Sequence, residues 1–245
     1  MSGRIIVISG ASTGLGLSLA SRFLKAEDTV YGVTRTRNHW DLAKKNLSNH
    51  SSSFFLYQLD CSREAEVKQF FSTVRKQAGK IDLLVNNAGY ANRPVRFEKE
   101  TLKEFEKNLS DNLISTFLMC KHALPIFLKQ KDGWIINISS TAGKRAVPGM
   151  AAYSAAKFGV LALSQSIAKE NLSAGFKCIT VCPGGMNTAM RVKVFGKEDA
   201  EKQQSADFVA DKILEMIDGK IAVESGGDLC IRHGKITAVN PPPEA

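Results

Sequence analysis

The chain has 245 residues, of which 44% are hydrophobic and 23% are charged. That length can bury a full core, and no Pro-, Gly- or Ser-rich linker divides it, so we expect one domain over 1–245. No apolar stretch approaches the ~20 residues of a membrane span, and the N-terminus lacks the layout of a signal peptide. We therefore expect a cytoplasmic protein without membrane contact.

The five cysteines are widely spaced, without a Cys-x-x-Cys pair or a neighbouring histidine. This pattern indicates reduced thiols and predicts no metal site. The formal net charge of +9 fits two kinds of partner, nucleic acid or a small anion. In segments 97–107 and 197–202, however, basic residues mix with glutamate, which is typical of solvated helix faces and argues against nucleic acid.

Short β-branched runs alternate with segments of helical period along the chain. The expected strands are Ile5–Ser9, Thr29–Val33, Phe54–Leu59, Ile81–Asn86, Trp134–Ser139 and Cys178–Cys182. The expected helices are Leu17–Lys25, Glu64–Ala78, Leu102–Leu128, Ala155–Asn171 and Asp207–Ile217. Continuous apolar strands are buried on both faces, and crossover helices connect parallel neighbours in a right-handed sense. The sequence therefore predicts an α/β fold, a doubly wound parallel sheet with helices on both faces.

The C-terminal part departs from this alternation. Segment 189–205 is polar and receives no assigned element, although a lid is one interpretation. Asp228–Val239 is expected to form a hairpin that turns at His233 and Gly234, within a short hairpin and tail over about 226–245.

A glycine-rich loop lies between the first strand and the first helix. Its residues of interest are Gly10, Ser12, Thr13, Gly14, Leu15 and Gly16. Glycines there permit a tight turn and let backbone amides approach a pyrophosphate at the helix N-terminus. The spacing is not G-x-G-x-x-G, so an ordinary capped turn is the alternative, but the place in the first βα unit favours a dinucleotide.

Two arginines follow the second strand. At this position an acidic residue binds a ribose 2′-hydroxyl, whereas arginine accommodates a 2′-phosphate. Arg35 and Arg37 occupy the strand end without a carboxylate beside them, and guanidinium groups pair well with phosphate. We therefore expect NADP(H) in preference to NAD(H). Surface arginines on a basic protein are the alternative.

Tyr153 and Lys157 are one helical turn apart on one helix face. A tyrosine pKa of ~10 is unsuited to acid–base catalysis at neutral pH, and a nearby cation lowers it by favouring the phenolate. Ser139 and Ser140 follow the fifth strand, where a hydroxyl can hydrogen-bond a substrate oxygen while Tyr153 exchanges its proton. For the tyrosine and lysine alone, a solvated helix face is the alternative.

Together these motifs resemble those of the classical short-chain dehydrogenase/reductase family, from about Arg4 to about Ile217. In chain order they are Gly10-x-x-x-Gly14-x-Gly16, Asn86-Asn87-Ala88-Gly89, Asn112, Ser140, Tyr153-x-x-x-Lys157, and Pro183-Gly184 followed by Thr188. The resemblance implies a Rossmann-type fold, a homodimer or homotetramer, and a small carbonyl or alcohol substrate.

The resemblance also implies roles for individual side chains. Tyr153 would be the general acid/base, and Ser140 would orient the carbonyl oxygen. Lys157 would bind the nicotinamide ribose and lower the pKa of Tyr153. Asn112 would hold a water of a proton relay, with helix packing as the alternative. The further cofactor contacts implied are Asp60, Cys61, Asn87, Ala88, Gly89, Pro183, Gly184, Met186 and Thr188.

The sequence departs from the family pattern at two places. Ser9 stands where the family usually has threonine, and it keeps the hydroxyl. Residues 226–234 replace the usual Asp-Gly-Gly end of the last strand, which puts in doubt the family's tetramer contact near the C-terminus, though not the active site.

The resulting expectation is an NADPH-dependent carbonyl reductase, or alcohol dehydrogenase in reverse, that moves a hydride between nicotinamide C4 and a substrate carbonyl. A catalytically silent NADP(H)-sensing regulatory protein of the same fold is the alternative, and the intact catalytic set argues against it. The substrate is open, with an acyl-carrier-bound 3-oxoacyl group as one candidate. Candidates for an apolar substrate pocket are Val147, Pro148, Met150, Met186, Met190, Val194 and Phe195.

Overall fold

The structure is a computed structural model that describes residues 3–50 and 52–243, so the ends of the expected domain, 1–2 and 244–245, lie outside the described part. The strands are β1 Ile5–Ser9, β2 Thr29–Thr34, β3 Phe54–Gln58, β4 Leu83–Asn86, β5 Trp134–Ile138, β6 Lys177–Pro183, β7 Met186–Asn187, β8 Gln204–Ser205, β9 Asp228–Arg232 and β10 Lys235–Asn240. The helices are α1 Gly14–Lys25, α2 Arg37–Asn46, α3 Glu64–Ala78, α4 Leu102–Asn108, α5 Ser115–Gln130, α6 Ala151–Glu170, α7 Ala189–Phe195, α8 Lys197–Glu201 and α9 Ala206–Ile217. Short helical turns are η1 Ser48–His50, η2 Phe97–Lys99, η3 Leu109–Ile114 and η4 Thr141–Gly143. Within the described ranges, no helix is both long and apolar enough to cross a bilayer.

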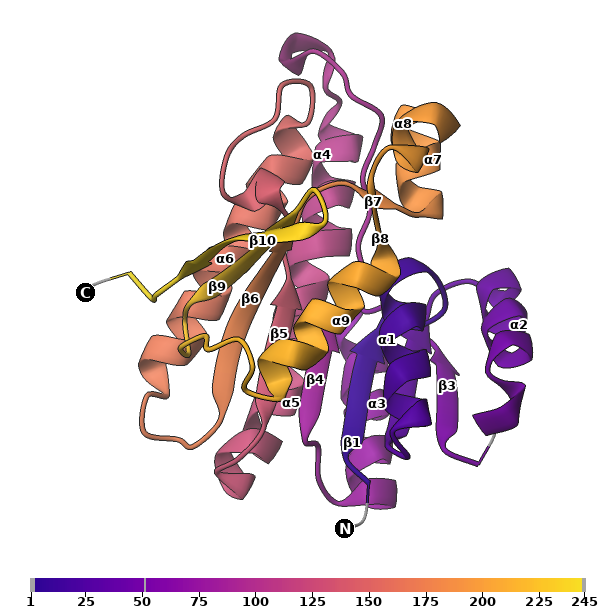
Figure 1. The fold of residues 1–245 in the computed structure, drawn as a ribbon, viewed down its shortest axis with the longest axis vertical. Helices are drawn as coiled ribbons and strands as arrows, with labels where there is room; N and C mark the ends of the chain where they lie inside the picture. Colours follow the sequence, from indigo (N-terminus) through magenta and orange to yellow (C-terminus); the bar gives the residue numbers. More distant parts are fainter. Residues whose placement is uncertain (1–2, 51, 244–245) are drawn as a thin grey trace.

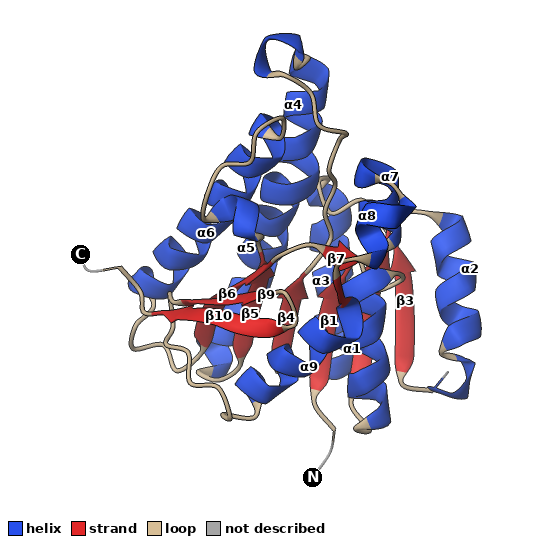
Figure 2. Ribbon diagram, turned by 45° about the horizontal axis from the view of Figure 1, so that its top comes forward, coloured by secondary structure: helices blue, strands red, loops and turns tan. Residues whose placement is uncertain are grey.

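In the described part of the chain, eight strands form one sheet in the order β10-β9-β6-β5-β4-β1-β2-β3. Every neighbouring pair is parallel except β9 and β10. The chain adds β2 and β3 on one side of β1 and then β4, β5 and β6 on the other, so the strand order reverses between β1 and β4. Helices cover both faces of the sheet, as Figure 1 and Figure 2 show. The predicted doubly wound α/β sheet is confirmed.

Two buried clusters hold the helices on the sheet. Ile6 and Ile8 pack in the cluster that contains α1 and α9, and Val7 packs in the opposite cluster with α3 and α5. All three side chains are fully buried, because side chains alternate along a strand that has helices on both sides. Each contributes about 1.5–3 kcal/mol by burial. This packing fixes the strand ends from which the loops of the site emerge.

The predicted helix over 102–128 is divided into three elements. Its middle, η3, is π-helical, and α4 and α5 flank it. A π-helical turn adds one residue to a helix and often marks a functional site. The apolar period over the whole segment is still helical, so periodicity does not reveal the interruption.

Segment 189–205, which received no assigned element, contains α7, α8 and β8. Both helices are short, and windows of ~11–18 residues do not detect elements of that length. Thr188 caps α7 by accepting a hydrogen bond from the backbone N–H of Arg191 at 3.3 Å. The strand β8 pairs with β7 outside the main sheet. In Figure 1 this segment lies beside the upper edge of the sheet.

The C-terminal hairpin turns at His233 and Gly234, as predicted. Their φ angles are +54° and +68°, the conformation that both central residues of a type I′ turn require. The first strand of the hairpin, β9, lies parallel to β6, and β10 forms the outer edge of the sheet. The end of the chain therefore extends the sheet on the side of β6.

Candidate active site

A cavity of about 440 Å³ opens at the carboxyl ends of the strands, where the strand order reverses. Its lining includes many predicted dinucleotide contacts, namely Gly10, Ser12, Thr13, Arg35, Asp60, Cys61, Ala88 and Gly89. Lining residues that the sequence reasoning missed include Thr34, His39, Leu59, Asp111 and Lys193. Thr34 and Leu59 could have been found from their places after the second and third strands. We name this hollow the first cavity.

The glycine turn keeps its backbone bare toward the first cavity. Gly10 has a φ of +66°, and a Cβ on Gly16 would collide with the carbonyl of Gly10. Asn87 donates from Nδ2 to the carbonyls of Ser9 and Gly10 at 3.2 and 3.1 Å. Ser9 Oγ accepts from the N–H groups of Asn87 and Ala88 at 3.0 Å each, so serine supplies the hydroxyl that this turn needs. Such a turn fits the close approach of a pyrophosphate.

Some predicted cofactor residues lie away from the first cavity. Leu15 is buried in the core under α1. Gly14 approaches Thr188, whose Cγ2 would lie 3.2 Å from a Cβ added there. Arg37 is the first residue of α2, and its guanidinium lies over the Trp40 ring, 5.2 Å from the centroid. Arg37 therefore does not line the cavity as we expected, because the helix turns its side chain toward its own next turn.

Arg35, in contrast, lines the first cavity. Its Nη1 donates to Asp111 Oδ1 at 2.9 Å and lies 3.9 Å from Asp60 Oδ2. Asp111 is buried and also accepts from Lys107 Nζ at 2.7 Å. The Arg35 side chain is 47% exposed, so its guanidinium is accessible to a ligand in the cavity.

Ser140 and Tyr153 lie on the wall of one cavity, described below as the second cavity. Ser140 follows β5, and its Oγ accepts from the N–H of Ala142 at 3.1 Å, which closes the η4 turn. Tyr153 lies in the first turn of α6. The preceding Ser139 donates to the carbonyl of Lys157 at 2.8 Å and is buried, so it has a structural role.

Lys157 is buried close to Tyr153. Its Nζ donates to the carbonyl of Ile138 at 2.9 Å and lies 5.7 Å from the centroid of the Tyr153 ring. Among the described residues it has no carboxylate partner, and burial lowers its pKa to about 8. A buried ammonium group without a counter-ion is costly, and such groups concentrate at functional sites.

The pKa of Tyr153 is raised rather than lowered. Burial raises it, because desolvation disfavours the phenolate, and the hydrogen bond with Ser140 and the charge of Arg191 lower it by less. We expected the ammonium of Lys157 to lower this pKa, but the cation that lowers it is Arg191, and burial outweighs that effect. Tyr153 is therefore a protonated phenol at neutral pH.

Asn112 lies in η3 and is fully buried. Its Nδ2 donates to the carbonyls of Tyr90 and Asn108 at 2.8 and 2.9 Å, and its Oδ1 accepts from the N–H of Tyr90 at 3.2 Å. A Cβ on Gly89 would lie 2.8 Å from Asn112 Oδ1 and 3.6 Å from Lys157 Nζ. The asparagine thus fixes the loop after β4 directly beside the lysine, and its part in a proton relay stays a prediction.

A second cavity, of about 260 Å³, adjoins the first, since Ala91 and Met190 line both. Ser140 and Tyr153 form part of its wall. The apolar candidates that line it are Val147, Met150, Met186, Met190, Val194 and Phe195. Pro148 does not line it. Of the residues expected beside the nicotinamide, Gly184, Met186 and Thr188 line the second cavity, and Pro183 lines neither.

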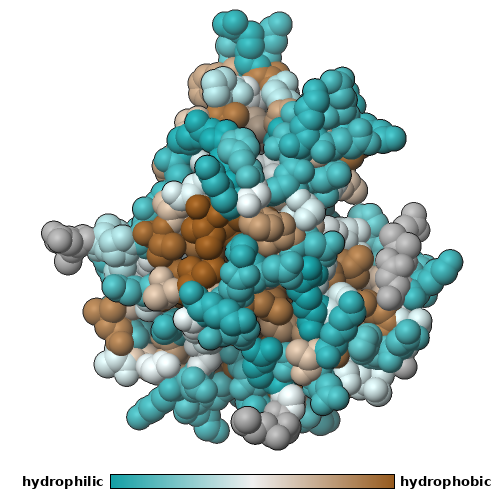
Figure 3. All heavy atoms as spheres, in the orientation of Figure 1, coloured by the Kyte–Doolittle hydropathy of each residue, from teal (hydrophilic) through white to brown (hydrophobic). Residues whose placement is uncertain are grey.

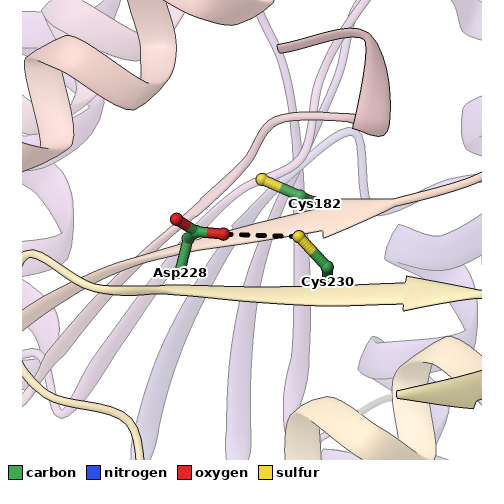
Figure 4. Close-up of side chains that lie close together, drawn as sticks. All are labelled: Cys182, Asp228 and Cys230. Carbon is green, nitrogen blue, oxygen red and sulfur yellow. Dashed lines mark hydrogen bonds between the residues drawn. The ribbon is translucent and has the colours of Figure 1, made fainter. Parts of the chain in front are cut away.

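Cys182, Asp228 and Cys230 come together where β6 pairs with β9 (Figure 4). Their sulfur and oxygen atoms lie within 4.8 Å of one another, the spacing of a metal-ligand set. Asp228, however, accepts from Lys144 at 2.7 Å, from Asn240 at 2.8 Å and from Cys230 at 3.3 Å. Because Lys144 compensates the carboxylate charge, we assign the cluster a structural role that ties the hairpin to the η4 loop.

The fold and these two adjoining cavities are those of a doubly wound α/β protein with a ligand crevice at the strand-order reversal. A family model described as short chain dehydrogenase matches residues 4–199. The chain belongs to that family, whose members are NAD(P)-dependent oxidoreductases acting on hydroxyl or carbonyl groups.

Known relatives extend over nearly the whole chain. It is 30% identical to a 2-(R)-hydroxypropyl-CoM dehydrogenase of Xanthobacter autotrophicus, with 96% of this chain and 99% of the relative covered. It is also 30% identical to an NADPH-dependent pterin aldehyde reductase of Arabidopsis thaliana, with 93% of each covered. Among solved structures, ElxO with NADP bound is similar with a TM-score of 0.86 and 26% identity, covering 94% of this chain and 97% of that one.

Proposed function

We propose that the protein is an NADPH-dependent carbonyl reductase that also runs in reverse as an alcohol dehydrogenase. The observation that carries this proposal is that Ser140 and Tyr153 share the wall of an apolar cavity that adjoins the first cavity. The pair places a hydroxyl donor and a protonated phenol where a substrate carbonyl would lie. Its 245 residues would form a single catalytic domain.

In the reduction, the bound nicotinamide supplies the hydride to the carbonyl carbon. Ser140 donates a hydrogen bond to the carbonyl oxygen and orients it. Tyr153 Oη transfers its proton to that oxygen as negative charge develops on it, so the products are an alcohol and a tyrosinate. In the oxidation the tyrosinate takes the alcohol proton back.

Lys157 and Asn112 would support this transfer. The ammonium of Lys157 would hold the nicotinamide ribose hydroxyls and stabilise the tyrosinate. Asn112 would hold a water that passes protons from solvent to Lys157. The support is geometric, because the asparagine amide and the ammonium group both lie beside Gly89, within 2.8 and 3.6 Å of the position that a Cβ would take there.

The dinucleotide would lie along the first cavity, with its pyrophosphate at the glycine turn and its adenosine between Arg35 and Asp60. Cys61, Asn87, Ala88 and Gly89 would flank the adenosine, and Pro183, Gly184, Met186 and Thr188 the nicotinamide. Arg35 would pair with the 2′-phosphate, which gives the preference for NADPH. Two of the similar proteins support this choice, since one is named NADPH-dependent and one holds NADP.

The cofactor preference is tested by charge reversal at the two arginines. We expect Arg35→Asp to weaken NADPH binding by about tenfold to a hundredfold and to leave NADH binding nearly unchanged, since only NADPH has the 2′-phosphate. Arg37→Asp is the matched control, because Arg37 does not line the first cavity. Fluorescence titration of both cofactors measures the affinities. Equal losses for NADPH and NADH would rule out the phosphate contact.

We also propose that the protein is a homodimer or homotetramer. Apolar side chains gather over the β9–β10 hairpin on the face in Figure 3, and Val239 on β10 is 43% exposed. A contiguous apolar surface of this kind is a candidate subunit interface. Light scattering coupled to size exclusion gives the mass in solution, and a monomer would contradict this assignment.

The proposed activity is tested by the loss of NADPH absorbance with a panel of small ketones and aldehydes. Tyr153→Phe removes the proton donor and keeps the ring, so we expect it to bind NADPH normally and to lose at least ~10²-fold in kcat. Full activity of this variant would overturn the role of Tyr153. Tight NADPH binding without turnover of any compound would instead favour the silent sensor of the same fold.

A further inference from the structure

Arg191 lines the second cavity and carries the only charge among the described residues that form its wall. The other lining side chains are apolar or hydroxyl-bearing, and Ser140 and Tyr153 are among them. A cation in an otherwise apolar substrate cavity is costly to keep there unless it has a partner. Asp199 supplies such a partner, but it contacts only Nε of the guanidinium.

The guanidinium of Arg191 is held in one orientation by two contacts. Its Nε donates to Asp199 Oδ1 at 2.5 Å, and the guanidinium carbon lies 3.9 Å from the centroid of the Phe195 ring. Within the described ranges, neither terminal nitrogen of Arg191 has a hydrogen-bond partner. Asp199 thus binds Nε of the guanidinium and leaves the two terminal nitrogens, Nη1 and Nη2, for a ligand.

We propose that Arg191 forms an anion subsite in the second cavity, and that the substrate is a small carbonyl compound whose apolar body ends in a carboxylate or a similar oxyanion. The inference rests on the proposed function. A planar fork of two N–H groups is the geometry that binds a carboxylate or another oxyanion through two parallel hydrogen bonds. The volume of about 260 Å³ limits the substrate to a small molecule.

The surroundings of Arg191 agree with an anionic substrate. Its positive charge lowers the pKa of Tyr153, so the guanidinium acts across the cavity on the phenol that would protonate the substrate. Lys193, on the same short helix α7, lines the adjoining first cavity and adds positive charge at the mouth. Arg191 and Lys193 thus place two positive charges on the walls of the two adjoining cavities.

A purely structural role for Arg191 makes a different prediction. In that case the ion pair with Asp199 would only join α7 to α8, and its loss would affect charged and neutral substrates equally. The two roles are separated by substrates that differ only in charge. Suitable pairs are para-acetylbenzoate with its methyl ester, and levulinate with methyl levulinate.

The test compares kcat and KM for both pairs in the wild type and in Arg191→Met, Arg191→Lys and Lys197→Met. In the wild type we expect kcat/KM for the acids to exceed that for the esters by about tenfold to a hundredfold. Arg191→Met should remove this difference through KM of the acids, with a much smaller change in kcat/KM for the esters. Arg191→Lys should keep part of it. Lys197→Met, which removes an exposed charge from α8, should behave as the wild type.

Calorimetry with para-acetylbenzoate and the NADP-loaded protein reads the subsite without turnover. Binding that is lost in Arg191→Met and kept in Lys197→Met supports the subsite, even if no carbonyl compound is reduced, in which case only the proposed reductase activity fails. Equal binding in the wild type and Arg191→Met overturns the subsite. Equal kcat/KM for acids and esters in an active wild type also overturns it and leaves the reductase activity standing.

Discussion

In the proposed mechanism, Tyr153 determines how the two directions of the reaction depend on pH. Burial raises its pKa, so the phenol carries its proton at neutral pH. Reduction uses the protonated form, and we expect its kcat/KM to be constant near neutral pH and to fall as pH rises through that pKa. Oxidation uses the tyrosinate and should rise over the same range. Rate profiles in both directions measure this, and two profiles with the same slope would contradict the assignment.

The buried ammonium group of Lys157 lowers the stability of the fold. Its pKa of about 8 in the fold lies below its ordinary value of 10.5, so between these values the unfolded chain binds more protons. Its unfavourable effect is therefore full below about pH 8 and disappears as pH rises toward the ordinary value.

We accordingly expect Lys157→Met to abolish activity and to raise the free energy of unfolding at neutral pH by on the order of 2 kcal/mol. The gain should shrink as pH rises above about 8 and vanish only well above the ordinary value of 10.5, where the lysine is neutral in both states. Urea denaturation over this pH range measures it. A variant less stable than the wild type at neutral pH would show that the hydrogen bond to Ile138 outweighs the burial of charge.

At the scale of elements, the π-helical turn η3 is what brings Asn112 to the loop after β4. Three hydrogen bonds, two of them to the backbone of Tyr90, depend on this one side chain. Asn112→Ala leaves buried backbone groups of Tyr90 unpaired, and we expect a loss of about 2–3 kcal/mol in the free energy of unfolding.

The variant should also reduce kcat, because the displaced loop carries Gly89 beside Lys157. Denaturation and steady-state kinetics on the same preparation check both effects. Thr116→Val is the control, since its hydroxyl bonds only the helical carbonyl of Asn112 at 2.7 Å. An equally large loss in Thr116→Val would show that the loss comes from disturbing the helix at η3 and not from removing the amide of Asn112.

The sequence predicted the elements whose pattern is long and regular. The first six strands of the sheet were predicted because each is a short run rich in apolar residues. Ser140 was chosen because it follows a strand, and Tyr153 because it lies one helical turn before Lys157. The short helices α7 and α8 were not predicted. The position of Arg191 on the wall of the second cavity depends on α7, so it could not be predicted either. The π-helical turn could not be predicted, because one extra residue hardly changes an apolar period. For the same reason, the hydrogen bonds from Asn112 to the backbone of Tyr90 could not be predicted.

Contacts between distant parts of the chain were also beyond the sequence. Asp111 follows no strand, and its hydrogen bond with Arg35 joins residues that are 76 positions apart in the chain. Cys182 and Cys230 are far apart in the chain and meet because β9 returns to pair with β6. Such contacts depend on strand order and register, which a single sequence does not specify by spacing.

At the scale of the whole molecule, the ion pair of Lys144 and Asp228 joins the C-terminal hairpin to the catalytic loop. Asp228 is almost fully buried and has three hydrogen-bond donors, so we expect Asp228→Ala to lower the free energy of unfolding by about 3 kcal/mol. Thermal denaturation measures this. The exposed pair of Lys202 and Glu198 is the control, and Lys202→Met should cost less than ~0.5 kcal/mol. Similar costs at both pairs would contradict the burial argument.

The outer strand β10 bears on how the protein avoids aggregation. An edge strand offers unpaired backbone groups to any other extended chain. Here the pairing register shifts between Ile236 and Ala238, and Thr237 in the shift turns its hydroxyl to the carbonyl of Cys230 at 3.4 Å. A bulge of this kind twists the edge, and Lys235 at its start adds a charge that a second strand would have to desolvate. The hairpin can thus present its face to another subunit while its edge resists open-ended growth of the sheet.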